Sequence, residues 1–189
     1  MSPLKASAIL FFSGAILGPV GDLCHLLTDT TSYPQQIYRF YFFNLIPFWV
    51  PLLFGSATLM IGLTHALCDA WFNVTQERFG TKHKVVGLLA PLFFLTVYGA
   101  SGLIPRGVVL LGIIAFLFWF FLDRTPLGAI LALLTALAGT SVEIGLVSNG
   151  IFSYQPHVSG LFGVAPWLPW LYVMASVAVG NLGRLLYRI

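Results

Sequence analysis

The chain has 189 residues, of which 58% are hydrophobic and only 8% are charged, and its formal net charge is +3. Soluble domains contain about 25% charged residues, so this composition excludes an ordinary soluble protein and predicts an integral membrane protein. The nine basic residues are dispersed along the chain, which argues against a nucleic-acid-binding surface.

Six apolar segments have the length of membrane-spanning helices, which need roughly 20 residues each. In chain order they are Ala6–Leu27, Leu45–Leu67, Val85–Leu103, Gly107–Leu122, Leu127–Val147 and Pro166–Tyr187. The first resembles a signal peptide, but no small-residue cleavage site precedes a polar sequence, so we expect a retained helix. The fourth is short unless Arg106 extends to the membrane interface. We therefore expect an all-α, polytopic membrane protein with a single domain over residues 1–189.

Six spans place both termini on one side of the membrane, and the basic residues indicate which side. Seven of them flank the spans on the side of the termini, and two flank the spans on the other side. The seven are Lys5, Arg78, Lys82, Lys84, Arg124, Arg184 and Arg188, and the two are Arg39 and Arg106. Because basic residues are enriched in cytoplasmic segments, we expect both termini in the cytoplasm.

Glycine and polar residues mark the first two predicted helices. Gly14 and Gly18 have the spacing of a GxxxG motif, which favours close packing of helices; alternatively, the small side chains leave room for a lipid.

The polar residues of these helices form two pairs. Asp22 and His25 share one helix face, and so do His65 and Asp69. Two ligands do not make a zinc site and no third lies within helical reach, so we expect local polar contacts and no metal site.

Glu143 lies about four residues before the end of the fifth predicted helix. A carboxylate in the membrane either reaches the interface or a polar partner, or it serves as a proton or cation site. The second interpretation would make the protein a small-solute transporter or channel. No second deep carboxylate or charged pore ring accompanies Glu143, so we favour the first. No hydrolase motif is present, and we expect no catalytic residues and no cofactor.

The sixth predicted helix carries a polar patch formed by Gly180, Asn181, Gly183 and Arg184. Glycine lowers helix stability, and a buried asparagine or arginine costs more. We expect the two glycines to admit a neighbouring backbone and Asn181 to hydrogen-bond across that contact. We expect Arg184 to pair with Asp69, with Asp123 or with the backbone of the loop that holds Asp123.

Five stretches resemble the Insig family, six-helix proteins of the endoplasmic reticulum that regulate sterol synthesis and that have shorter bacterial homologues. The stretches are PFWVPLLFG, LCD, FWFFLDRT, VSNGIFSY, and WLP together with VAVGNLGRLL. The matching residues are Trp49, Val50, Pro51, Gly55, Asp69, Trp119, Asp123, Arg124, Asn149, Gly150, Tyr154, Trp167, Leu168, Pro169, Gly180, Asn181, Gly183 and Arg184. Each stretch alone is weak evidence for the resemblance, but the five stretches occur in the same order as in the family.

The resemblance implies a regulatory membrane protein that binds a lipid without catalysis. Eukaryotic members bind oxysterols and then retain membrane partners that carry a sterol-sensing domain, and Asp123 matches an aspartate tied to partner binding. Trp119 matches a tryptophan near the sterol pocket. Candidate wall residues of a lipid cavity are Tyr98, Phe116, Trp119 and Phe120, which would otherwise pack in the bundle or face lipid. We expect structural roles for Trp49, Pro51, Asn149, Gly150, Trp167, Pro169 and the polar patch of the sixth helix.

The sequence departs from the animal proteins in three ways. It has neither their long N-terminal tail nor their polar C-terminal tail. The loop between its third and fourth helices is shorter, and Glu143 stands where a neutral residue is expected. These departures resemble a short bacterial homologue, for which we expect either a sterol or a diacylglycerol-like lipid as the ligand. The membrane would be the plasma membrane in a bacterium and the endoplasmic reticulum in a eukaryote. A polytopic membrane protein or a second copy of the chain would be the partner.

Overall fold

The computed structural model describes residues 1–34, 41–42, 45–74 and 80–187. These residues form six α-helices: α1 (Pro3–Leu27), α2 (Trp49–Trp71), α3 (Gly80–Ser101), α4 (Val108–Leu122), α5 (Pro126–Ser148) and α6 (Leu168–Tyr187). Two small antiparallel ladders join the loops, one between β1 (Thr31–Ser32) and β4 (Ser153–Tyr154), the other between β2 (Tyr41–Phe42) and β3 (Ile46–Pro47). A short 3₁₀ turn, η2 (Leu161–Gly163), precedes α6.

Each of the six predicted spans is an α-helix, which confirms the all-α membrane fold. Within the described ranges, four helices are long and apolar enough to cross a membrane, and α4 is apolar but has only 15 residues. Both ends of α2 differ from the prediction, since it begins at Trp49 rather than Leu45 and continues to Trp71, and α3 begins at Gly80 rather than Val85. The start of α2 is later because Ile46 and Pro47 form strand β3.

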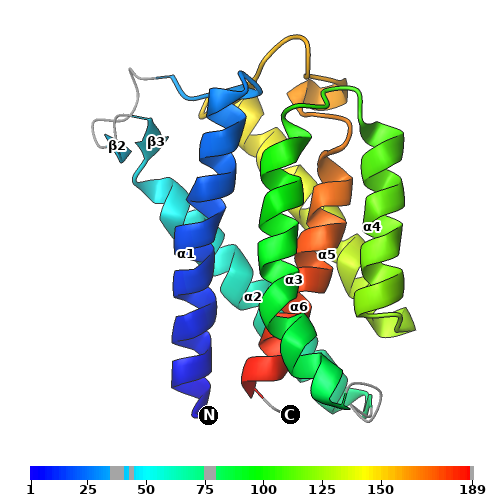
Figure 1. Cartoon of the computed structure of the whole chain (residues 1–189). Coiled ribbons are helices and arrows are strands. Elements are labelled where there is room, and N and C mark those ends of the chain that lie inside the picture. The colour runs from blue at the N-terminus through cyan, green and yellow to red at the C-terminus, as the bar shows by residue number, and fades with distance from the viewer. Residues whose placement is uncertain (35–40, 43–44, 75–79, 188–189) are drawn as a thin grey trace.

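The sixth helix is the centre of the bundle. It contacts α1, α2, α3, α4 and α5, whereas α4 packs mainly on α6. Figure 1 shows α6 in orange and red behind α3, with α1 and α2 on one side and α4 on the other. Thirteen of the 20 residues of α6 are buried, compared with three of the 15 residues of α4. Protein rather than lipid therefore surrounds α6, which makes a polar patch in this helix tolerable.

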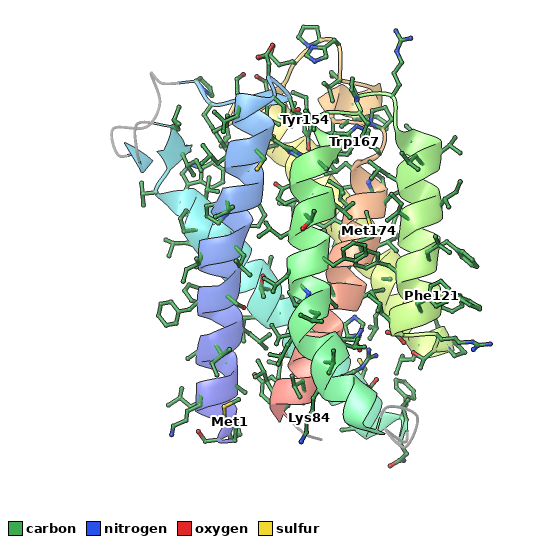
Figure 2. The ribbon with its side chains drawn as sticks, viewed as in Figure 1. Met1, Lys84, Phe121, Tyr154, Trp167 and Met174 are labelled. Atoms are coloured by element: carbon green, nitrogen blue, oxygen red, sulfur yellow. The ribbon has the colours of Figure 1, made fainter. Side chains whose placement is uncertain are left out.

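Both termini lie at the same end of the bundle (Figure 1), as six spans require. We call this end, which carries Met1 and Lys84, the inner end, and the opposite end, which carries Tyr154 and Trp167, the outer end (Figure 2). The basic residues at 39, 78 and 188 that contribute to the predicted orientation lie outside the described residues, as does the side chain at 82.

The GxxxG face of α1 is used inside the chain. A Cβ atom at Gly14 would lie 2.2 Å from the hydroxyl of Thr58, and one at Gly18 would lie 2.2 Å from the ring of Phe54. Both neighbours belong to α2, so these glycines allow α1 and α2 to pack closely, as predicted. This face is accordingly covered and does not serve contacts between copies.

The Asn-Gly pair of the VSNGIFSY stretch ends helix α5. Gly150 has φ +66°, a left-handed conformation that glycine adopts without strain. Its amide donates to Val147 O, and the amide of Ile151 donates to Leu146 O, which is the Schellman pattern of helix ends. The side-chain amide of Asn149 donates to Gly145 O at 2.7 Å. Together these bonds end α5 and direct the chain toward β4.

Candidate functional site

A cavity of about 510 Å³ lies in the bundle, with walls mainly from α2 and α5. Along most of its length the wall is apolar, with Leu53 and Ala57 on α2 and Leu131 and Ala138 on α5 among the lining residues. Met60 on α2 is 68% exposed and Leu134 on α5 is 56% exposed, although both line the cavity. The cavity therefore opens between α2 and α5, toward the space that lipid occupies.

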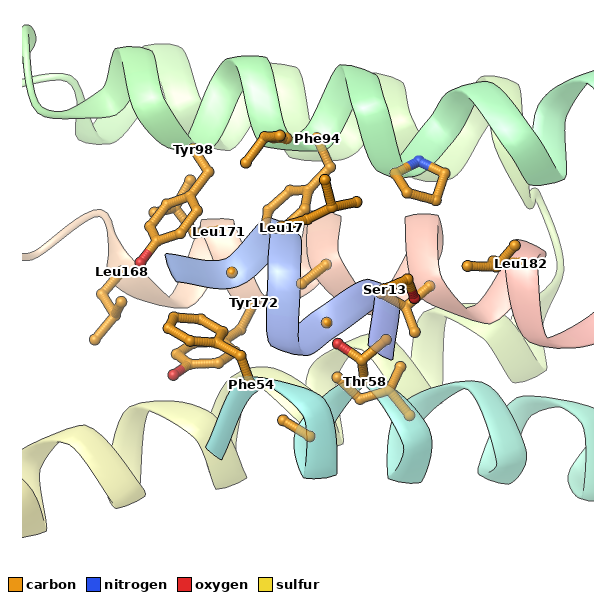
Figure 3. Close-up of a pocket in the computed structure, with 18 of the residues that line it drawn as sticks. Ser13, Leu17, Phe54, Thr58, Phe94, Tyr98, Leu168, Leu171, Tyr172 and Leu182 are labelled. Atoms are coloured by element: carbon orange, nitrogen blue, oxygen red, sulfur yellow. The ribbon is translucent and has the colours of Figure 1, made fainter. Parts of the chain in front are cut away.

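A smaller pocket of about 100 Å³ lies between α1, α2, α3 and α6. It shares Phe54, Tyr98 and Tyr172 with the larger cavity, so the two spaces adjoin at these three rings. Figure 3 shows the rings at one end of the smaller pocket, with Ser13 and Thr58 farther along it. The combined space has two apolar arms that meet near one aromatic region.

The aromatic region carries a half-buried carboxylate on α5. Tyr154 donates a hydrogen bond to Glu143 Oε2 at 2.5 Å, and Tyr172 donates to Glu143 Oε1 at 2.7 Å. Glu143 also lines both pockets. The carboxylate is thus held by polar partners inside the bundle, and it does not extend to the membrane surface as one form of the sequence interpretation would require.

A second carboxylate lines the same outer part of the cavity. Tyr33 donates a hydrogen bond to Asp22 Oδ2 at 2.5 Å. His25 bonds instead to the hydroxyl of Ser101 at 2.9 Å and to Tyr98 O at 3.0 Å. The contact expected between Asp22 and His25 is therefore not the one that forms, because each side chain reaches a partner on another element.

The pKa values of the two tyrosines outside the helices, Tyr33 and Tyr154, are shifted by burial and by the nearby carboxylates. Burial, together with the nearby charges of Asp22 and Glu143, raises the pKa of Tyr33 well above its usual value. Burial and the charge of Glu143 raise the pKa of Tyr154 in the same direction. Both phenols therefore keep their protons at physiological pH and act as hydrogen-bond donors to the carboxylates.

Polar groups also line the cavity nearer the inner end. The Nε2 atom of His65 lies 2.9 Å from the hydroxyl of Ser176, which accepts a hydrogen bond from Thr135 at 3.1 Å. The ring of His65 packs on Gly180, where a Cβ atom would lie 2.6 Å from the ring. His65 and Asp69, which share a face, thus serve different partners. No group of potential metal ligands occurs in the part of the chain that the structure describes.

Arg184 forms a buried ion-pair cluster at the inner end, as the sequence predicts. Its Nε atom donates to Asp69 Oδ2 at 2.5 Å, and its Nη1 atom donates to Asp123 Oδ2 at 2.9 Å. All three residues are at most 5% exposed. The cluster joins the end of α2 and the loop after α4 to the central helix.

The loop after α4 is built around the carboxylate of Asp123. Its Oδ1 atom accepts from the amide of Thr125 at 3.1 Å and from the hydroxyl of Thr125. A Cβ atom at Gly128 would lie 2.1 Å from the same carboxylate, so the start of α5 must pack directly on it. Trp119 closes the loop by donating from its indole nitrogen to Thr125 O at 3.0 Å. Asp123 therefore faces the interior of the protein, not its surface.

Of the four candidate wall residues, Tyr98 lines the cavity and the other three do not. Phe116 is 57% exposed on α4, Trp119 bonds to the loop, and Phe120 packs under the guanidinium of Arg124 at 4.8 Å. The placement differs because α4 packs mainly on α6 and contributes none of the residues that line the cavity. An apolar helix of this kind has no periodicity from which its cavity-facing side could be predicted.

The polar patch of α6 follows the prediction at Gly183 and Arg184 but not at Gly180, which packs on the ring of His65 rather than on a backbone, nor at Asn181. Gly183 lies against Gly62 of α2, where a Cβ atom would be 2.2 Å from the Gly62 carbonyl oxygen. Asn181 does not bond across this contact, because its amide donates to Val177 O of its own helix at 2.8 Å. The two helix backbones therefore meet directly, with no side-chain bridge from this residue.

The remaining family-matched residues begin the helices at the outer end. Trp49 is the first residue of α2, lines the cavity and packs edge-on against Tyr33 at 6.0 Å. Trp167 is fully buried and packs edge-on against His25 at 5.6 Å. Pro51 and Pro169 lie in the first turns of α2 and α6, where proline is tolerated because these amides have no helical acceptor.

Sequence reasoning missed several residues of the outer cavity. Thr31, Tyr33 and Tyr172 line it, but they carry no recognisable motif. Thr31 and Tyr154 are brought together by the β1–β4 ladder, which pairs them directly. The available signal was the presence of two carboxylates in apolar helices, since each of them requires polar partners somewhere in the bundle.

Comparison with known proteins was made at the level of sequence and of structure. No family model matches the chain. The chain is 32% identical over 188 residues to an INSIG protein homolog of Mycolicibacterium vanbaalenii, with 96% of this chain and 87% of that protein covered. It is 28% identical to the insulin-induced gene 1 protein of Danio rerio, with 96% and 72% covered, and 25% identical to that of Homo sapiens, with 96% and 65% covered.

Solved structures give the same result. A crystal structure of an Insig homolog from Mycobacterium vanbaalenii matches with a TM-score of 0.81 and 30% sequence identity, covering 97% of this chain and 94% of that chain. A crystal structure of a cross-linked trimer of that homolog matches with a TM-score of 0.83 at the same identity and coverage.

Proposed function

The chain belongs to the Insig family, and from this premise we propose that it is a membrane regulator that holds a lipid in its intramembrane cavity. Like its relatives it is a multi-pass membrane protein and not an enzyme. We propose further that the lipid is a sterol or a diacylglycerol-like molecule, and that its binding regulates a membrane partner. The observation that carries the proposal is the cavity of about 510 Å³ whose walls come mainly from α2 and α5.

The form of the cavity supports a lipid ligand. Ligand sites are concave and mostly apolar, with a few polar groups that fix orientation, and this cavity has an apolar length and a polar outer end. The adjoining pocket adds a second apolar arm. A lipid with two apolar chains and one hydroxyl suits this shape, and a single rigid sterol would occupy the larger arm alone.

Filling the cavity is expected to remove the bound lipid. Ala57 on α2 lines both pockets, so Ala57→Phe places a ring where the two arms adjoin. We expect the amount of sterol or diacylglycerol that co-purifies, measured by mass spectrometry after extraction, to fall by about tenfold.

The matched control is Ala70→Phe, which makes the same change on α2 at an exposed position outside the cavity. It should retain lipid at the wild-type level. Equal lipid in the two variants, or a wild-type protein that binds neither lipid class, would contradict the proposed function.

Partner binding is proposed at the loop after α4, which Asp123 organises. Because the carboxylate of Asp123 is bonded to Arg184 and Thr125, we expect it to act by fixing the loop and not by touching the partner. A photocrosslinker at exposed Arg124 should capture the partner in native membranes, and Asp123→Ala should lower the yield several-fold. Unchanged crosslinking in Asp123→Ala would contradict this role, and a crosslinker at Leu103, exposed at the outer end, is the positional control.

The same experiment tests self-association. The relative of known structure was crystallised as a cross-linked trimer, and we propose that this chain also forms a homo-oligomer. Crosslinked species at multiples of 20.7 kDa would support it. The face of α1 that carries Gly14 and Gly18 is not available for this contact, because it packs on α2.

The alternative of a transporter or channel that uses Glu143 has less support. Both oxygens of this carboxylate already accept hydrogen bonds from Tyr154 and Tyr172. Solute flux in proteoliposomes that is abolished by Glu143→Gln would favour this alternative over the regulator.

A further inference from the structure

The outer end of the cavity carries more hydrogen-bond acceptors than the single hydroxyl of a neutral lipid can bond. Asp22 and Glu143 both line the cavity there, one on α1 and the other on α5. In the part of the chain that the structure describes, every ion pair of a carboxylate belongs to Arg184 at the inner end, so these two carboxylates have no cationic partner. Their hydrogen bonds come from the phenols of Tyr33, Tyr154 and Tyr172, which are uncharged donors.

A buried hydroxyl in the cavity wall, that of Thr31, lacks a hydrogen-bond partner among the described residues. Thr31 is 4% exposed, and the atom that lacks a partner is its Oγ1. Thr31 is the cross-strand partner of Tyr154 in the β1–β4 ladder, so its side chain lies on the same face of the ladder as the tyrosine that bonds Glu143. A buried hydroxyl that lacks a partner costs free energy, and a ligand that donates a hydrogen bond would remove that cost.

The walls around these acceptors are aromatic. Tyr33, Trp49, Phe54, Tyr98, Phe152 and Tyr172 line the cavity together with Tyr154. The rings contact one another in a chain: Trp49 packs on Tyr33 at 6.0 Å, and Tyr33 packs on Phe152 at 5.9 Å. Aromatic faces attract cations, and a ring of them with carboxylates nearby is the usual surrounding of a bound alkylammonium group.

We propose that the cavity binds lipophilic amines, with the ammonium group at Asp22, Glu143 and Thr31 and the hydrocarbon part in the apolar arms. An ammonium has three N–H donors and no acceptor, which matches an end of the cavity that offers two carboxylates and one free hydroxyl. It also supplies the positive charge that these carboxylates otherwise lack. A lipid alcohol has one donor and no charge, so it satisfies only one of the three acceptors. This inference rests on the proposed function, since it requires that the cavity accept a lipid, and it adds a class of ligand.

The test compares two probes that differ only in the head group. Radiolabelled octadecylamine and octadecanol are bound to the wild-type protein in nanodiscs of zwitterionic lipid, which limits the attraction of the amine to the membrane surface. We expect the amine to bind about tenfold more tightly than the alcohol, because a desolvated ammonium gains both charge-assisted hydrogen bonds and contacts with aromatic rings. N-acetylation of the amine removes the charge, and it should lower the affinity to that of the alcohol.

Variants locate the effect in the protein. In Asp22→Asn/Glu143→Gln the preference for the amine over the alcohol, taken as the ratio of the two affinities, should fall to near unity. Asp29→Asn, which makes the same change at an exposed carboxylate outside the cavity, should leave the preference unchanged. The single variants are each expected to lose part of the preference, and they serve if the double variant does not fold.

The outcomes separate this inference from the proposed function. Equal binding of amine, acetylated amine and alcohol to the wild-type protein would overturn the amine site and leave the lipid cavity intact. A preference that survives in the folded variants would place the amine elsewhere and would also overturn the inference. Failure of all three probes to bind would overturn the lipid cavity itself.

Discussion

Replacing Arg184 with methionine is expected to destabilise the folded protein by about 3–5 kcal/mol, because it leaves two buried carboxylates without a counter-charge. Asp69 is 5% exposed and Asp123 is 3% exposed, and both ion pairs depend on this guanidinium. Methionine retains the apolar part of the side chain, so the loss of stability measures the contribution of the charge and of its hydrogen bonds. Unfolding in detergent, followed by helical circular dichroism against temperature or denaturant, measures the change.

Arg106→Met is the matched control, because Arg106 is an exposed basic residue in the loop before α4. Its effect should stay within about 0.5 kcal/mol. Neutralising the two acids as well, in Arg184→Met/Asp69→Asn/Asp123→Asn, should restore part of the stability, since no buried charge then remains. A single Arg184→Met variant as stable as the control would show that the cluster is not needed for folding.

Gly183→Ala is expected to cost about 3 kcal/mol or more, which is the upper part of the range for overpacking. The added methyl group would lie 2.2 Å from the carbonyl oxygen of Gly62 and 2.6 Å from its Cα and carbonyl carbon. All of these are backbone atoms, so no side-chain rotation can relieve the contact, and α2 and α6 must move apart. The same unfolding measurement detects the loss.

Substitutions at two other glycines are comparisons for the expected loss of stability in Gly183→Ala. Gly62→Ala should be milder than Gly183→Ala, because its methyl group would meet mainly the flexible end of Leu10, with Gly183 Cα farther away at 3.4 Å. Gly145→Ala meets nothing within 4 Å and should leave stability unchanged or raise it by up to about 1 kcal/mol. Equal losses in all three variants would indicate a general effect of helix glycines rather than a specific contact of backbones.

The sequence was a good guide to the helices and to the charged cluster. The six apolar segments determine the spans, because membrane thickness fixes their length, and a deeply placed Arg184 must find an acid near its own depth. Asp69 and Asp123 were its available partners at the inner end, and the structure joins it to both.

The cavity was not predictable to the same extent. Its walls depend on which face each helix turns inward, and helices such as α4 are apolar all round, so Phe116, Trp119 and Phe120 could not be placed from their spacing. The outer polar region combines residues from α1, α5, α6 and two loops, and the ladder between β1 and β4 brings Thr31 beside Tyr154. Pairing of two-residue strands far apart in sequence leaves no pattern in the sequence.

The central position of α6 has a consequence for biosynthesis. The ribosome completes α1 to α5 before it completes the helix that all of them contact, so the bundle cannot close as the early spans enter the membrane. Among the residues that the structure describes, only Arg184 of α6 forms ion pairs with Asp69 and Asp123, so these pairs and the contact of Gly62 with Gly183 wait for α6. Insertion of α6 supplies the counter-charge and the close backbone contact in one step, which makes its arrival the event that commits the nascent chain to its final structure.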